Sequence, residues 1–202
     1  MNAETNLWLD AARQTVVSYR NMIDASVSQL SDEELFQRPA AGINSVAIIL
    51  RHLGGNLRSR WTNFLTTDGE KETRDRDTEF LDWEGDRQSL IEAFDTGWSA
   101  LVDALASIDH ENVHQNVLIR GEPHTVAQAV TRSLTHVSYH VGQIAIIARM
   151  VHAGQWRWLT IAPGNSQTHN ATTWGTSASR SIHAAVDDKP PQSSAKDPSS
   201  RQ

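Results

Sequence analysis

The stretch that decides the fold is TVAQAVTRSLTHVSYHVGQIAIIARMVH, residues 125–152. Its apolar side chains recur at steps of three and four residues, which is the period of one face of an α-helix. They are Val126, Val130, Leu134, Val137, Val141, Ile144 and Ala148. Thr125 and Gln128 have the spacing of a capping box, and Gly154 follows as a stop signal. The pattern predicts a long amphipathic helix.

Two histidines, His136 and His140, flank this apolar stripe. A spacing of four residues places both imidazoles on one face of a helix, so the pair can ligate one metal ion. The spacing alone is a weak signal, because the nine histidines of the chain give roughly 0.4 such pairs by chance. A second pair, His110 and His114, lies in a segment without an apolar stripe. The alternative interpretation is a hydrogen-bonded histidine pair at the edge of the core.

Helical periodicity also dominates the rest of the chain. Three further long segments show it, over about residues 5–30, 44–65 and 86–107. A capping box at Ser31–Glu34 opens a short helical turn. Residues 113–123 read as a short strand or hairpin, with residues 120–123 as the turn. Four long amphipathic segments predict an all-α fold, a four-helix bundle with a short β-hairpin before the last helix. In such bundles, metal sites form from side chains on facing helices.

The chain length and the distribution of polar residues suggest one domain and a tail. A chain of 202 residues is long enough for a single helical domain, which we expect over residues 1–170. Residues 171–202 are rich in Ser and Pro and predict a disordered tail. Residues 66–84 are polar and charged and predict a long loop.

Composition argues against several classes of function. The chain has no cysteine, so it has no disulfide, no thiolate zinc site and no cysteine nucleophile. Its net charge is −6 and it shows no basic patch, which argues against nucleic-acid binding. The longest apolar run, Val46–Leu50, is too short to cross a bilayer, and the N-terminus lacks the pattern of a signal peptide. We therefore expect a cytoplasmic protein with no membrane partner.

Several motifs occur in a fixed order along residues 5–170. They are HLGGN at 52–56, RWTNFLTTDGEK at 60–71, RDRDTEF at 74–80, HVSYHVGQI at 136–144 and WLTIAPGNS at 158–166. Together they resemble the DinB/YfiT-like superfamily, and more narrowly a bacterial branch of it that is a domain of unknown function.

The resemblance implies a four-helix bundle that holds one divalent metal ion with three histidines. By position these are His52, His136 and His140, and the ion is usually zinc or nickel. Three imidazoles also suit iron or copper, and manganese stays an alternative. Candidates for orienting a ligand or a substrate are Asn56, Arg60 and Gln143. The resemblance identifies no catalytic residue.

Three functions fit these observations. The first is a metal-dependent S-transferase that joins a low-molecular-weight thiol to an electrophile, as some superfamily members do. Metal coordination would stabilise the thiolate, and arginines such as Arg58, Arg60, Arg74 and Arg76 could bind its carboxylates. The second is a metal-dependent hydrolase, which would need Asp75, Asp77 or Glu79 to fold in as a base. The third is a non-catalytic, stress-related metal-binding homodimer.

Overall fold

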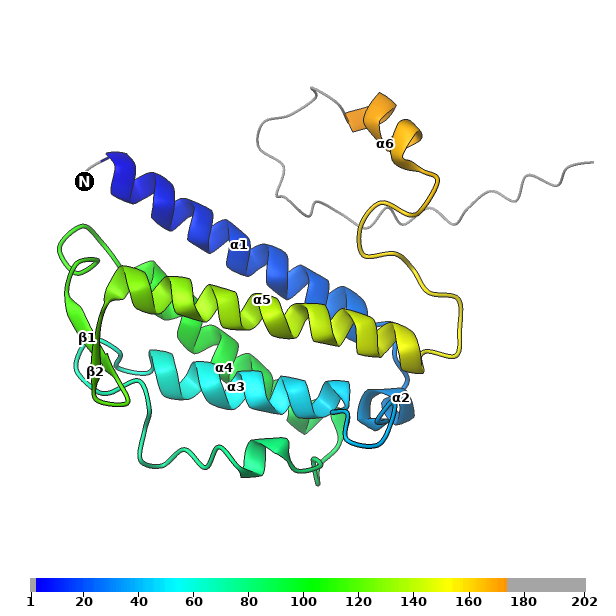
Figure 1. Ribbon diagram of the computed structural model, residues 1–202, viewed down its shortest axis with the longest axis horizontal. Helices are drawn as coiled ribbons and strands as arrows, with labels where there is room; N and C mark the ends of the chain where they lie inside the picture. The colour runs from blue at the N-terminus through cyan, green and yellow to red at the C-terminus, as the bar shows by residue number, and fades with distance from the viewer. Residues whose placement is uncertain (1–2, 174–202) are drawn as a thin grey trace, which may run out of the picture.

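The computed structural model describes residues 3–173 (Figure 1). Six α-helices, a 3-10 turn (η1) and a two-stranded hairpin follow one another along this part of the chain. Their order is α1 (Ala3–Val27), α2 (Asp32–Phe36), α3 (Val46–Trp61), η1 (Thr78–Phe80), α4 (Arg87–Ser107), β1 (Asn116–Ile119), β2 (Glu122–Thr125), α5 (Val126–Val151) and α6 (Ser166–Thr173). The mainly helical class and the hairpin before the last long helix are confirmed. No helix of residues 3–173 is both long and apolar enough to cross a membrane.

Four long helices, α1, α3, α4 and α5, enclose the core. Helix α3 packs on α4, α1 packs on α5, and α3 also contacts α5 (Figure 1). Leu9, Leu50, Phe94 and Ile144, one from each helix, are almost fully buried in one apolar cluster. At the far end of α3, the indole of Trp61 donates a hydrogen bond of 3.0 Å to the Ser133 hydroxyl on α5. Helix α3, which carries His52, and α5, which carries His136 and His140, are therefore neighbours, as a shared metal site requires.

The caps at the helix starts agree with the sequence, whereas α3 ends earlier than expected. Both capping boxes form, at Ser31–Glu34 and at Thr125–Gln128. Ser45 caps α3 and Asp86 caps α4, each by accepting a backbone N–H three residues on. Helix α3 ends at Trp61, four residues before the expected Leu65, because Thr62 is extended and Asn63 has a φ of 50°. A repeating apolar pattern cannot reveal such a local change of backbone conformation.

The hairpin turns more tightly than expected. Strands β1 and β2 pair antiparallel, and Pro123 lies in β2 opposite Leu118 instead of in the turn. The turn consists of Arg120 and Gly121, with φ values of 56° and 76°. Two positive φ values match the type I′ turn, whose twist suits a two-residue hairpin. The Asp68 carboxylate accepts the backbone N–H groups of both turn residues, at 2.8 and 2.7 Å, so it ties the long loop to the hairpin.

Helices α3 and α4 come closest at two glycines. A Cβ on Gly97 would overlap the backbone carbonyl of Gly54, and a Cβ on Gly54 would lie 2.9 Å from the Cα of Phe94. The two backbones can approach this closely only because both positions lack a side chain. This contact fixes the position of α3 on α4 two residues after His52.

The C-terminal part of the chain differs from the expectation in one respect. The predicted domain boundary at residue 170 falls inside α6, so helical structure continues past the expected start of the tail. The remainder of the predicted tail, residues 174–202, lies outside the described residues.

Candidate metal centre

Three histidine side chains meet between α3 and α5. His52 lies on α3, and His136 and His140 lie one turn apart on α5. The Nε2 atom of His136 is 3.2 Å from Nε2 of His52 and 3.2 Å from Nε2 of His140. The possible ligand atoms of all three lie within 4.8 Å of one another. The three histidines thus form a cluster that could hold a metal ion.

The separation of these nitrogen atoms fits a shared ion. Two nitrogens bound tetrahedrally to one Zn²⁺ at about 2.0–2.1 Å lie roughly 3.3 Å apart. The two observed separations of 3.2 Å match that value. Three protein ligands leave a fourth position open, which is the pattern of catalytic metal sites and not of structural ones.

Two of the three imidazoles are oriented by hydrogen bonds from their other nitrogen. Nδ1 of His52 lies 2.8 Å from Oε2 of Glu79, and Nδ1 of His140 lies 2.8 Å from Oε1 of Gln143. Each partner accepts the Nδ1 proton and leaves the Nε2 lone pair free for an ion. Nδ1 of His136 is buried and has no hydrogen-bond partner among the residues that the structure describes.

Burial keeps the two histidines of α5 uncharged. The pKa of His136 is lowered to about 3, mainly by burial and in smaller part by the neighbouring His140 and His52. Burial also lowers the pKa of His140 to about 4, although its hydrogen bond to Gln143 acts in the opposite direction. Both imidazoles are therefore neutral at physiological pH, which is the form that binds metal.

Glu79 links the centre to a buried arginine. Burial alone would raise the pKa of Glu79, but hydrogen bonds from Arg74 and His52 outweigh burial and hold the pKa below its ordinary value. Arg74 donates to both carboxylate oxygens, at 2.8 and 2.7 Å, and also to Glu70. The Glu79 side chain is 7% exposed and that of Arg74 is 5% exposed. The ionised Glu79 carboxylate is thus hydrogen-bonded to His52 and to Arg74 at the same time.

The structure shows which of the other residues suggested by the sequence lie at the metal centre. Gln143 contacts a histidine, as expected, whereas the Asn56 side chain makes no hydrogen bond to another residue of the described chain. His110 and His114 are exposed in a turn, so they form no helical pair. The role of Glu79 as an orienting group was missed, because the sequence suggested it only as a base folding in from the loop. The sequence feature that could have pointed to Glu79 was the RDRDTEF motif at residues 74–80, which contains it.

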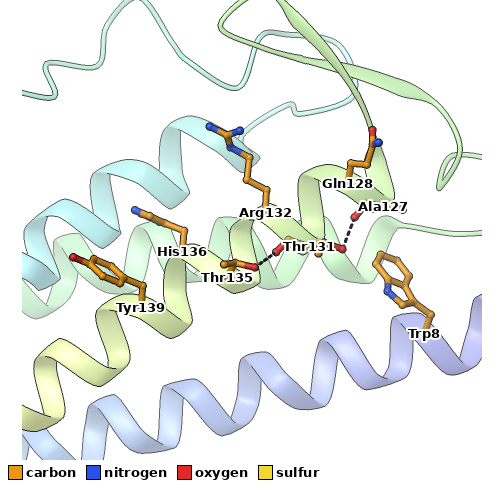
Figure 2. A pocket seen from close by; sticks show the side chains of 8 residues that line it. All are labelled: Trp8, Ala127, Gln128, Thr131, Arg132, Thr135, His136 and Tyr139. Atoms are coloured by element: carbon orange, nitrogen blue, oxygen red, sulfur yellow. Dashed lines mark hydrogen bonds between the residues drawn. The ribbon is translucent and has the colours of Figure 1, made fainter.

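An open groove of about 780 Å³ adjoins the centre (Figure 2). Its lining comes from α5 and from one residue of α1, namely Ala127, Gln128, Thr131, Arg132, Thr135, His136, Tyr139 and Trp8. His136 belongs to both the groove and the histidine cluster. A small molecule in the groove would therefore lie against one side of the centre, and the volume is in the range of small-molecule sites.

Gly55 leaves the space that Glu79 occupies. A Cβ at Gly55 would overlap Oε1 of Glu79 and lie 2.8 Å from its Cδ. We expect Gly55→Ala to displace the carboxylate from His52 and to weaken metal binding about tenfold or more, as loss of such a partner typically does. Competition with a chelating dye measures the change.

Gly142→Ala is the matched control, because a Cβ there meets nothing within 4 Å and the residue lies next to the ligands on α5. Equal metal affinity in Gly55→Ala and Gly142→Ala would contradict the role given to Gly55.

Comparison with known proteins identifies a family and a fold but no activity. No curated protein matches the chain. A crystal structure described as the conserved protein of locus from Enterococcus faecalis is similar, with a TM-score of 0.53 and 17% sequence identity over 69% of this chain and 94% of that one. At this identity the likeness shows the fold alone. Residues 3–165 match a family described as "Protein of unknown function (DUF1572)", and this chain therefore belongs to the DUF1572 family.

Proposed function

We propose that the protein binds one divalent metal ion, zinc or nickel, through the Nε2 atoms of His52, His136 and His140. We further propose that it is a DinB-like four-helix protein that uses this ion to transfer a low-molecular-weight thiol to an electrophile. The observation that carries the proposal is the convergence of the three histidines in one cluster. In two of them the other ring nitrogen, Nδ1, is held by a hydrogen bond, to Glu79 from His52 and to Gln143 from His140. Location in the cytoplasm and assembly as a homodimer stay predictions of the sequence.

The bound ion would supply the positive charge that favours the thiolate over the thiol. The thiol would lose its proton to water, and its sulfur would form the new bond as the leaving group departs with its electron pair. The chain would contribute neutral histidines that keep their orientation, and a groove beside His136 in which the electrophile can lie. Such a reaction requires no cysteine of the protein, and the chain has none.

Hydrolysis is supported less well. A metal-bound water would need a carboxylate base that is free to take its proton. Glu79 does reach the centre, but His52 and Arg74 occupy its oxygens. Asp75 and Asp77 are exposed. Thiol transfer does not need such a base at the protein, and we therefore prefer it.

Metal analysis tests the ligand set. The wild-type protein, purified without a histidine tag, should contain about one metal ion per chain, and His136→Ala less than about 0.2. His114→Ala is the matched control, because it removes an exposed histidine from a turn. Equal metal content in wild type and His136→Ala would exclude the assignment.

A transfer assay tests the reaction. A panel of low-molecular-weight thiols is incubated with a chromogenic aryl halide, and loss of thiol and release of halide are both followed. We expect turnover that a chelator abolishes and that divalent zinc or nickel restores. Turnover that is absent with every thiol, or that persists in chelator, would contradict the S-transferase proposal. Chelator-sensitive cleavage of an ester without thiol would favour a hydrolase instead.

A further inference from the structure

Arg60 at the end of α3 lies close enough to three other arginines, Arg74 in the following loop, Arg120 in the hairpin turn and Arg132 on α5, for their charges to act on it. Two of these four arginines have acidic partners. Arg74 pairs with Glu79 and Glu70, and Arg120 pairs with Glu70. The other two, Arg60 and Arg132, form no ion pair with any of residues 3–173.

Arg60 is the more unusual of these two. Its Nη1 atom is buried without a hydrogen-bond partner among the described residues. Burial lowers the pKa of Arg60, and the positive charges of Arg132, Arg74 and Arg120 lower it further, while Glu70 only partly offsets them. A half-buried guanidinium whose Nη1 is buried without a partner, next to three other positive charges, destabilises the folded chain. Its presence therefore calls for a partner that the described chain does not provide.

Arg132 places this positive charge beside the groove. It is exposed, it lines the groove with His136, and it precedes His136 by one helical turn on α5. Figure 2 shows its guanidinium extending from α5 toward the end of α3, where Arg60 lies. Arg60 is also close enough to His136 to lower the pKa of that imidazole. Arg132 thus lines the groove, and Arg60 lies near enough to both Arg132 and His136 to interact with them electrostatically.

We propose that Arg60 and Arg132 form a subsite for an oxyanion group, a carboxylate or a phosphate, of the small molecule that occupies the groove. The planar guanidinium matches both groups, since it can donate two parallel hydrogen bonds to two oxygens. Anion binding would give Nη1 of Arg60 its missing acceptor and would offset the repulsion among the arginines. The assignment of this molecule as the substrate rests on the proposed function, whereas the subsite itself does not require the metal.

The first test is calorimetric titration of the full chain at low salt with two probes, inorganic phosphate and glutarate. We expect saturable binding of at least one probe, and the preferred probe distinguishes a phosphate from a carboxylate site. Arg132→Gln should bind the preferred probe about tenfold or more weakly, because a charge-assisted hydrogen bond is lost. Arg58→Gln is the matched control: the sequence suggested Arg58 as a carboxylate ligand, but it is exposed on the same helix as Arg60 and does not line the groove, so its loss should change nothing.

His136→Ala separates this proposal from the proposed function. It removes a metal ligand and leaves both arginines, so it should lose metal and keep anion binding. Anion binding that persists without metal would support the subsite even if the transfer assay fails. Absence of saturable binding of both probes, or an equal loss in Arg58→Gln and Arg132→Gln, would overturn the subsite.

The second test uses the sign of a stability change. Arg60→Met keeps the aliphatic stem and removes the buried charge, so we expect its melting temperature without anion to be higher than that of the wild type. The same variant should lose the rise in melting temperature that the preferred probe causes in the wild type. A lower melting temperature without anion would mean that Arg60 is a structural residue, which would contradict the proposal. If Arg60→Met does not fold, the titration of Arg132→Gln decides the question.

Discussion

Replacing Gly97 by alanine should lower the free energy of unfolding by about 3 kcal/mol or more, at the upper end of the usual cost of overpacking. The added Cβ would overlap the carbonyl carbon and oxygen of Gly54, and these are backbone atoms of a neighbouring helix. A side chain could rotate away, but here α3 and α4 must separate. Urea denaturation followed by far-UV circular dichroism measures the change.

The sign of this effect is what makes the experiment informative. Inside an ordinary helix, alanine is more favourable than glycine by about 1 kcal/mol. Gly142→Ala, at an open position of α5, should show that gain or no change. If Gly97→Ala were as stable as Gly142→Ala, the close approach of α3 and α4 would be wrong.

Glu79→Ala should affect both the fold and the metal centre. It leaves the Arg74 guanidinium buried with only Glu70 as a partner, and breaking such a buried pair typically costs about 3–5 kcal/mol. It also leaves Nδ1 of His52 without its acceptor, which should weaken metal binding by about 10–100-fold. Thermal unfolding and metal competition measure the two losses separately.

A double variant distinguishes these losses. Glu79→Ala with Arg74→Met removes both charges, so most of the lost stability should return while the metal affinity should not. Recovery of both properties would mean that Glu79 acts on the metal only through the general stability of the loop. Unchanged metal affinity in Glu79→Ala alone would exclude the orienting role.

The sequence predicts those parts of the fold that repeat. Apolar side chains every three or four residues locate the four long helices, and the caps at Ser31 and Thr125 place two helix starts correctly. The helical spacing singles out His136 and His140, the resemblance adds His52, and the structure brings the three together because α3 and α5 pack on each other.

What the sequence does not predict depends on contacts between segments. Glu79 lies 27 residues from His52, in the short 3-10 turn η1 of a segment without apolar periodicity, so no local pattern links the two. Gly54 and Gly55 are adjacent in one motif, yet their roles differ. Gly54 allows the backbone of α4 to approach closely, whereas Gly55 leaves space for the Glu79 side chain. Asn56 shows the converse: it lies four residues after His52 and was a candidate for orienting a ligand, but its side chain makes no hydrogen bond to another residue of the described chain.

The sequence separation of the histidines has a consequence for the unfolded chain. His52 and His136 are 84 residues apart, and an ion held by both would close the segment between them into a loop. In the chain-entropy treatment of cross-links, closing a loop of this length raises the free energy of the unfolded state by about 4.6 kcal/mol. A protein without cysteine would thus gain, from its metal, the kind of covalent-like restraint that secreted domains obtain from a disulfide bond.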